Sequence, residues 1–205
     1  MNPFPIDQIS LADPADAKPL ACLIAEAFHP IAPSKWLIPD DEARRELFPG
    51  YFRMYVEDAF SHGLVYTTED LSAVALWLEK PGTPHISDGW YGEMLEELTG
   101  VYAPRFRVFD RELDAHHPTG VAHHHLAILA VHPKHQRCGM GTALLERHHQ
   151  QLDKAETPAY LEASDAETRE LYLRHGYADL GTGPIILPEG PRMYPMVRRP
   201  VARVQ

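Results

Sequence analysis

The sequence predicts an α+β fold, in which helices cross a mixed, mostly antiparallel sheet. Two observations lead to this prediction. Short apolar runs typical of strands alternate along the chain with longer segments whose apolar residues recur at helical spacing. The chain also ends in a hairpin pattern, "PIILPEGPRMYPMV", whose turn lies at 188–191.

Length and composition restrict the class of protein. The 205 residues are expected to form a single domain, 1–205, and 44% apolar with 23% charged residues is ordinary for a globular protein. The formal net charge of −10 argues against a nucleic-acid or membrane-surface binder, so any anion site must be built locally. No apolar run reaches membrane-span length, and the N-terminus lacks a signal-peptide pattern. Because Cys22 and Cys138 are the only cysteines, a cytoplasmic protein is expected.

The N-terminal half is expected to begin with a short strand, 6–9, and an amphipathic helix. A loop over 31–41 precedes a longer helical segment, which Pro49 and Gly50 are expected to interrupt. Two strands follow, joined by a polar turn near residues 69–70. This order of elements is compatible with helices packed against an antiparallel hairpin.

Residues 80–118 break this rhythm and are predicted to be an insertion that forms a pocket. Turn-favouring residues open the segment, and two short helices follow at about 90–98 and 104–114. Such an insertion, beside the 29–50 segment, would close a pocket around a small molecule. The aromatic residues that could form its walls are Phe28, Trp36, Tyr51, Trp90 and Tyr91.

The C-terminal half holds the clearest strand. "VAHHHLAILAVHP" is apolar at its centre and stops at Pro133, and a helix over 139–155 follows. "PAYLEAS" reads as the next strand and "SDAETRELYLRHG" as the next helix. Ser164 and Glu167 are expected to form its capping box, and Gly176 suits its C-terminal end.

The turn "HQRCGMG", at 135–141, predicts an anion site. A helix N-terminus presents unpaired N–H groups and the positive end of the helix dipole. Gly139 and Gly141 would let a phosphate approach the backbone without a Cβ in the way, and Arg137 adds positive charge. The pattern lacks the third glycine of a dinucleotide fingerprint and the Gly-Lys-Ser/Thr of a nucleotide P-loop.

The same turn carries a family resemblance. "QRCGMG" resembles the Q/R-x-x-G-x-G/A signature of the GNAT superfamily of acyl-CoA-dependent N-acyltransferases. "LAILAVHP" resembles that family's fourth strand, and "LEAS…ELYLRHGY" its fifth strand and following helix. Local phrases such as "AVALW" and the closing hairpin are most similar to puromycin N-acetyltransferase-type members from actinobacteria. The resemblance covers roughly residues 120–198 and implies the GNAT fold, with strands four and five splayed apart.

The resemblance also implies a cosubstrate and an acceptor. It indicates acetyl-CoA as acetyl donor, the primary amine of a small molecule as acceptor, and direct attack in a ternary complex. In the family the CoA pyrophosphate binds turn amides, and the pantetheine arm lies along the edge of strand four like an added strand. Many relatives carry Asn where this chain has Asp165, and a carboxylate does not favour an anionic cofactor. The residues assigned to CoA are Leu129, Ala130, Val131, Gln136, Arg137, Cys138, Gly139, Met140, Gly141, Thr142 and Asp165.

Three residues are candidates for proton transfer. By the resemblance, Tyr172 protonates the leaving thiolate of CoA, although its spacing alone favours a core tyrosine. His125, on the strand face opposite His124, and Glu162 are rival candidates for the base that takes the proton of the amine. A strand-four amide, that of Val131 or a neighbour, is expected to polarise the thioester carbonyl.

Other chemistries stay open. His123 and His125 are spaced to share a metal ion, and His116, His117, His148 and His149 are further possible ligands. No carboxylate–histidine or Cys–His spacing completes a site, and no metal is expected. Cys138 could be a nucleophile at a helix N-terminus, but direct transfer needs no acyl-enzyme. The alternative functions are a non-catalytic acyl-CoA sensor of the same fold and a protein N-acetyltransferase, which would need an open groove. A homodimer is compatible with each of these functions.

Overall fold

The computed structural model of the chain describes residues 4–82 and 90–201. The strands in these ranges are β1 (Ile9–Leu11), β2 (Gly63–Thr68), β3 (Ala73–Lys80), β4 (His123–Val131), β5 (Ala159–Ala163), β6 (Tyr177–Asp179), β7 (Ile185–Ile186) and β8 (Arg192–Arg198). The α-helices are α1 (Ala17–Phe28), α2 (Ala32–Leu37), α3 (Asp41–His62), α4 (Trp90–Thr99), α5 (Ala103–His116), α6 (Met140–Lys154) and α7 (Ala166–Arg174). Within these ranges no helix combines the length and the apolar character that crossing a bilayer requires.

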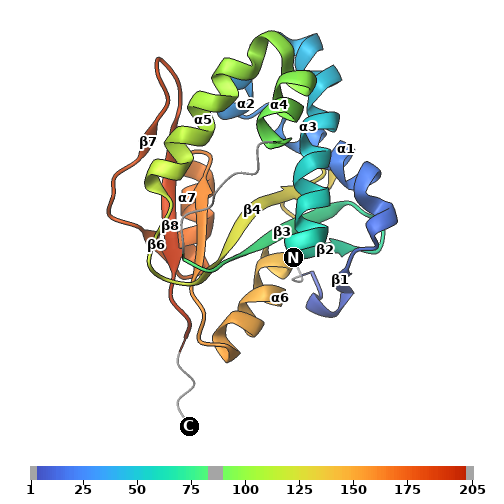
Figure 1. The fold of residues 1–205 in the computed structure, drawn as a ribbon. Helices are drawn as coiled ribbons and strands as arrows, with labels where there is room; N and C mark the ends of the chain where they lie inside the picture. The colour runs from blue at the N-terminus through green and yellow to red at the C-terminus, as the bar shows by residue number, and fades with distance from the viewer. Residues whose placement is uncertain (1–3, 83–89, 202–205) are drawn as a thin grey trace.

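The strands form one sheet through the middle of the molecule (Figure 1). Their order is β1-β2-β3-β4-β5-β8-β6, and β7 pairs with β8 beside this path. All pairs are antiparallel except β4 with β5, which are parallel. The predicted mixed, mostly antiparallel sheet flanked by helices is therefore confirmed.

Each face of the sheet has its own apolar core. On one face α1 and α3 pack on β3 and β4, through residues such as Leu20, Phe48 and Ile128. On the other face α6 packs on the same strands, through residues such as Leu144 and Leu126. Burial of both faces explains why β3 is a nearly continuous apolar run, "AVALWL", instead of an alternating one.

A β-bulge in β4 changes which residues face each core. Leu76 of β3 pairs with Ile128, but the next residue, Trp77, pairs with Leu126, so Ala127 has no partner across the ladder. One extra residue reverses the alternation of side chains along the strand. Leu126 accordingly packs with α6, whereas Ile128 packs with α1 and α3.

The structure corrects three local predictions. The segment 31–41, expected as a loop, contains α2, and α3 continues through Pro49 without interruption. Burial of aromatic residues on α3, such as Phe48 and Phe52, outweighs the helix-breaking tendency of proline. The predicted strand at 6–9 is a 3-10 helix followed by β1.

The cap of α7 also differs from the prediction by one residue. Its capping box consists of Asp165 and Thr168, and not of Ser164 and Glu167. Asp165 Oδ1 accepts a hydrogen bond from the Thr168 amide at 2.7 Å, and the Thr168 hydroxyl accepts one from the Asp165 amide at 3.1 Å. Aspartate and serine are about equally good N-cap residues, so the sequence pattern alone does not decide whether Ser164 or Asp165 caps the helix.

Two histidines of α6 are buried against the sheet. The ring of His148 stacks on Trp77 with centroids 4.3 Å apart, and its Nε2 lies 3.1 Å from Nδ1 of His124. His149 Nε2 lies 3.0 Å from the hydroxyl oxygen of Tyr177. Burial first, and then the neighbouring basic side chains, lower the pKa of each of the two α6 histidines to about 3. Both rings are therefore neutral at pH 7.

We expect the folded state to lose stability as the pH falls below about 6.5. An unfolded histidine titrates near pH 6.5, so between that pH and about 3 the unfolded chain binds more protons than the folded one. Each buried histidine then costs about 1.4 kcal/mol per pH unit. His149→Phe is expected to reduce the slope of unfolding free energy against pH by about one proton, measured by urea unfolding. The exposed His62 provides the control, His62→Phe, and equal slopes in wild type and His149→Phe would contradict the expectation.

Candidate active site

Strands β4 and β5 separate shortly after they begin. They pair only at His124 with Ala159 and at His125 with Tyr160. Beyond these pairs β4 stays on β3 up to Val131, and β5 stays on β8 along its length. The bulge in β4 lies directly after the last shared pair, and bulges bend the strand that carries them. The predicted splay of strands four and five is confirmed, and it leaves two inner strand edges without a neighbouring strand among the described residues.

The two glycines of the turn after β4 have different structural roles. Gly139 is the N-cap of α6 with φ +87°, a left-handed conformation that favours glycine, and a Cβ there would lie 3.0 Å from the backbone nitrogen of Phe4. Gly141 lies inside the helix, where a Cβ would lie 3.8 Å from Val131 Cγ2 and 3.9 Å from Leu129 Cδ2. The fold needs glycine at 139 but would accept a side chain at 141. With glycine at 141, no side chain of that residue stands between α6 and the Leu129 and Val131 side chains of β4.

The first turn of α6 presents free backbone donors. Gly139 provides no side-chain cap, and the first α6 amide with a backbone partner is that of Ala143, which donates to the Gly139 carbonyl at 3.0 Å. The amides of Met140, Gly141 and Thr142 precede it and have no intrahelical acceptor. These N–H groups and the helix dipole make the end of α6 that adjoins β4 attractive to an anion.

Side chains of the turn are mostly exposed. Arg137 has φ +63°, and its side chain is 89% exposed, 3.7 Å from Glu167. Gln136 folds back and donates from Nε2 to the Val131 carbonyl at 3.2 Å. Cys138 is also exposed, and its Sγ lies 3.6 Å from the Gln136 carbonyl oxygen. The Thr142 hydroxyl lies 3.3 Å from Nε2 of His175.

The two rival base candidates of the sequence lie against each other. His125 Nε2 and Glu162 Oε2 are 2.8 Å apart, although the residues come from different strands. The side chain of His125 is 14% exposed and that of Glu162 is 7% exposed. His124 points to the opposite face, toward His148, as the strand alternation predicted. The rivals therefore form one hydrogen-bonded pair.

The carboxylate of this pair is the ionised partner. Burial raises the pKa of Glu162, but the charge and hydrogen bond of His125, with smaller contributions from His117 and Tyr160, bring it below its usual range. Its second oxygen, Oε1, is buried and has no hydrogen-bond partner among the described residues. Glu162 therefore carries a negative charge at neutral pH, and only its Oε2 has a hydrogen-bond partner among the described residues.

His117 and Tyr160 complete the surroundings of the pair. The sequence marked His117 only as one of several spare histidines and did not mark Tyr160, and it placed neither beside the pair. The rings of His117 and His125 lie 5.0 Å apart, and the ring of Tyr160 lies 5.4 Å from that of His125. Burial and the neighbouring His125 lower the pKa of His117 to about 3, against the opposing charge of Glu162. His117 follows the end of α5, so only the path of the predicted insertion brings it to β4.

Tyr172 and Asp165 are engaged within the protein. Tyr172 is buried on α7 and packs edge-on against Tyr177, with ring centroids 5.6 Å apart. Burial raises its pKa, and the charge of Asp165 raises it further, so the phenol keeps its proton at neutral pH. The carboxylate of Asp165, assigned to the cofactor by resemblance, caps α7 through the Thr168 amide.

A further acidic group lies on α5 between α3 and α4. The Tyr91 hydroxyl donates to Asp110 Oδ2 at 3.0 Å, and the hydroxyls of Tyr51 and Tyr55 lie 3.0 Å apart beside them. Burial raises the pKa of Asp110 to about 6. Asp110 lies within α5, whereas His117 is the residue that ends this helix, with an extended backbone (ψ 132°). No pattern in the sequence marked Asp110.

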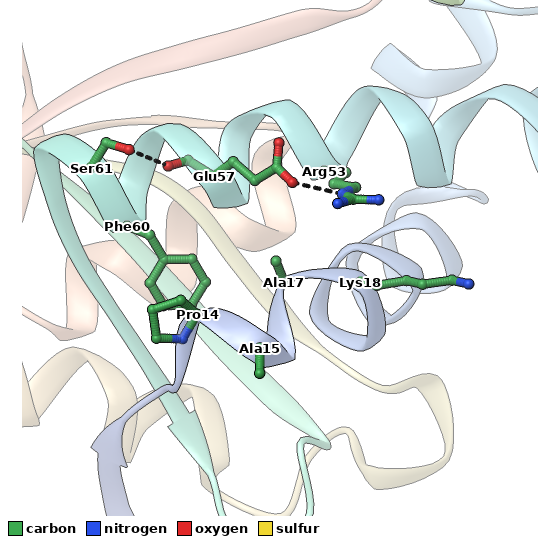
Figure 2. Close-up of a pocket in the computed structure, with 8 residues that line it drawn as sticks. All are labelled: Pro14, Ala15, Ala17, Lys18, Arg53, Glu57, Phe60 and Ser61. Carbon is green, nitrogen blue, oxygen red and sulfur yellow. Dashed lines mark hydrogen bonds and ion pairs between the residues drawn. The ribbon is translucent and has the colours of Figure 1, made fainter.

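Figure 2 shows a hollow on another part of the surface, between the start of α1 and the end of α3. Arg53 Nε donates to Glu57 Oε1 at 2.7 Å along its rim. Its lining residues are Pro14, Ala15, Ala17, Lys18, Arg53, Glu57, Phe60 and Ser61. None of the residues predicted to act on a substrate belongs to it.

Comparison with known proteins agrees with this arrangement. Residues 106–179 match the family model described as the acetyltransferase (GNAT) domain. The chain is similar to a protein from Corynebacterium glutamicum described as "histone acetyltransferase HPA2 and related acetyltransferase", with TM-score 0.70 and 23% identity over 97% of this chain and 98% of that one. The chain has the GNAT fold. Arylalkylamine N-acetyltransferase 2 from Aedes aegypti shares this fold, with TM-score 0.64 and 13% identity over 93% and 97% of the two chains.

The GNAT fold also occurs in an agmatine N-acetyltransferase variant, with TM-score 0.57 and 15% identity over 93% of this chain and 98% of that one. The family match begins in α5 and ends in β6. It therefore includes the split between β4 and β5, the glycine turn, the His125–Glu162 pair and Tyr172. The matched portion carries every residue predicted to bind CoA or to transfer a proton, whereas the aromatic residues predicted to form pocket walls lie outside it.

Proposed function

We propose that this protein is an N-acetyltransferase that moves the acetyl group of acetyl-CoA to a primary amine of a small molecule. The observation that carries the proposal is the position of the His125–Glu162 pair. The pair lies where β4 and β5 separate, and the glycine turn follows at the far end of β4. A proton acceptor and an anion site at the two ends of one strand suit attack by an amine on a CoA thioester.

The residues of the turn fit a CoA molecule. The amides of Met140 to Thr142 and the exposed Arg137 would hold its pyrophosphate, and the inner edge of Leu129 to Val131 would pair with its amide-rich arm. A Cβ on Gly141 would project toward that edge, so glycine there suits a ligand running along β4. The thioester supplies an activated acetyl group.

The pair then provides the proton acceptor. Because Glu162 stays ionised and donates no proton, His125 Nε2–H is the donor in their hydrogen bond and Nδ1 keeps its lone pair when the ring is neutral. His125 takes a proton from the substrate ammonium, and Glu162 orients the ring and stabilises the imidazolium. In this scheme Glu162 is a positioning residue.

The remaining bonds change in one displacement. The neutral amine nitrogen attacks the carbonyl carbon, the carbon–sulfur bond breaks, and a backbone amide of β4, that of Val131 or a neighbour, stabilises the oxyanion. Tyr172 gives its proton to the departing sulfur. The proton left on the new amide nitrogen goes to water or back to the tyrosinate, so that amide, CoA thiol and one released proton are the products.

The acceptor proposal rests on charge and enclosure. An overall charge of −10 and the carboxyl of Asp110 favour a cation over an anion. Helices α4 and α5 lie on the same side of the sheet as α3 (Figure 1), and His117, directly after α5, packs its ring 5.0 Å from that of His125. This enclosure favours a small acceptor over a protein tail. The local likeness to puromycin N-acetyltransferase-type sequences points the same way.

Gly141→Leu is expected to weaken CoA binding at least tenfold, about 1.4 kcal/mol, without unfolding the protein. The new side chain would cover the β4 edge beside Val131 and Leu129, where the protein itself has room for a Cβ. Calorimetric titration with CoA measures the effect. Gly92→Leu on α4, where a Cβ meets nothing within 4 Å, is the matched control. Unchanged affinity in the Gly141 variant would exclude this turn as the pyrophosphate site.

His125→Ala and Glu162→Gln are each expected to lower kcat by about 10²–10⁴-fold, with little change in affinity for acetyl-CoA. Since the two side chains act as one pair, the double variant should be hardly slower than the worse single variant. Release of CoA thiol with a panel of amines gives the rates. His124→Ala, from the opposite face of β4, serves as control. Full activity in both single variants would refute the pair, and CoA binding without turnover in wild type would favour the acyl-CoA sensor.

Tyr172→Phe is expected to reduce kcat within the same range of about 10²–10⁴-fold. The substitution removes only the hydroxyl and keeps the ring that packs against Tyr177, so the melting temperature and CoA affinity should stay near those of wild type. Single-turnover measurements separate the chemical step from CoA release. An equal single-turnover rate would remove Tyr172 from the mechanism.

A further inference from the structure

Three side chains of different elements converge at the split between β4 and β5. One ligand atom each of His117, His125 and Glu162 lie within 4.8 Å of one another, and among the described residues this is the one such group with three members. Two imidazoles and one carboxylate are a donor set that transition-metal ions, Zn²⁺ in particular, bind with open positions left for other ligands.

The buried carboxylate supplies an independent sign of a ligand. The Glu162 side chain is 7% exposed, and its Oε2 lies 2.8 Å from His125 Nε2. The Tyr160 hydroxyl helps to lower its pKa, but no group of the described residues makes a geometrically sound hydrogen bond to its Oε1. A buried carboxylate oxygen without a partner is costly, because the charge has left water without compensation. A cation bound between Glu162 and the histidines would provide that compensation.

A neighbouring histidine fixes His117 in a form suited to bind a metal. His123 Nδ1 lies 2.9 Å from the Val121 carbonyl, which accepts only, so Nδ1 of the neutral His123 ring carries the proton. His123 Nε2 is then an acceptor, and at 3.0 Å it receives a hydrogen bond from Nε2–H of His117. The lone pair of His117 is left on Nδ1. Metal-binding histidines commonly donate their other N–H to such an acceptor.

We propose that His117, His125 and Glu162 bind a divalent transition-metal ion, with Zn²⁺ as the preferred species. A tetrahedral ion with bonds of ~2.1 Å needs donor atoms ~3.4 Å apart. The ion replaces the proton shared by His125 and Glu162, which must separate by about 0.6 Å from their present 2.8 Å. His123 acts through His117 as a positioning residue, and the fourth position is open to water.

Metal binding at this place has a consequence for the proposed reaction. The ion occupies both His125 and Glu162, so the proton acceptor is lost while metal is bound. Zn²⁺ is thus a reversible inhibitor of acetyl transfer. This consequence rests on the proposed function, whereas the binding of the metal does not.

The binding test uses the full chain without a histidine tag. Calorimetry with Zn²⁺ should give one site per chain, and Co²⁺ should give the visible absorption bands of a tetrahedral complex. His117→Ala and Glu162→Gln each remove a ligand and should weaken Zn²⁺ binding at least ~100-fold, while His123→Ala, which removes the hydrogen-bond partner of His117, should weaken it ~10-fold or more. A chelator-reversible rise in melting temperature provides a second readout.

The control is a histidine outside the group. His135 is exposed and its ring lies 5.5 Å from that of His132, so His135→Ala reports any binding at that surface pair. Its affinity for Zn²⁺ should equal that of wild type. Affinity unchanged by His117→Ala and Glu162→Gln, in variants whose circular dichroism shows them folded, overturns the site. So does the absence of Co²⁺ bands in wild type. Inactive protein that still binds Zn²⁺ overturns the proposed function and leaves the metal site standing.

Discussion

The separation of β4 from β5 is the constraint on which the rest of the site depends. The extra residue at Ala127 reverses the alternation of side chains halfway along β4. Before the bulge, His125 points to the α5 side, where Glu162 of β5 meets it. After the bulge, Leu129 and Val131 turn to the α6 side, where Gly141 approaches them. In a strand without the bulge, His125, Leu129 and Val131 would all face the same side of the sheet. The bend that accompanies the separation of β4 from β5 would then be missing.

The two ends of this split differ in electrostatic character. At the α6 end, helix amides and Arg137 create local positive potential on a chain whose net charge is −10. At the α5 end lie the carboxyl groups of Glu162 and Asp110, and burial together with the neighbouring His125 lowers the pKa of His117 to about 3, so that this ring is neutral at pH 7. The proposed anionic donor and the proposed cationic acceptor would therefore be attracted to opposite ends of β4, and this electrostatic difference would orient them without a contact specific to either.

Local sequence patterns predicted most helices and strands of the fold, but they did not predict which side chains of the site contact one another. Period-2 alternation placed His125 and His124 on opposite faces, and glycine spacing with a family signature marked 136–141. The contact of His125 with Glu162 joins residues 37 positions apart. It depends on the register of two parallel strands, which no turn between them fixes. The prediction was also wrong where packing outweighs the intrinsic helix propensity of a residue, as at Pro49, which lies inside the uninterrupted helix α3.

His117 shows why the last part of the site escaped sequence reasoning. It stands directly after α5, in a segment whose only visible signals were turn residues and short helices. Its position depends on α5 crossing to β7 and on the Tyr160 hydroxyl donating to the carbonyl of His116 at 3.5 Å. With His117 in place, the Glu162 carboxylate has one imidazole bound to it and a second close by, yet one oxygen stays unsatisfied. The proposed metal ion would offset the cost of this unsatisfied oxygen beside the neutral His117 ring. In that proposal a proton and the ion compete for the same lone pairs, so the solution pH and the free metal concentration together decide which of them is bound.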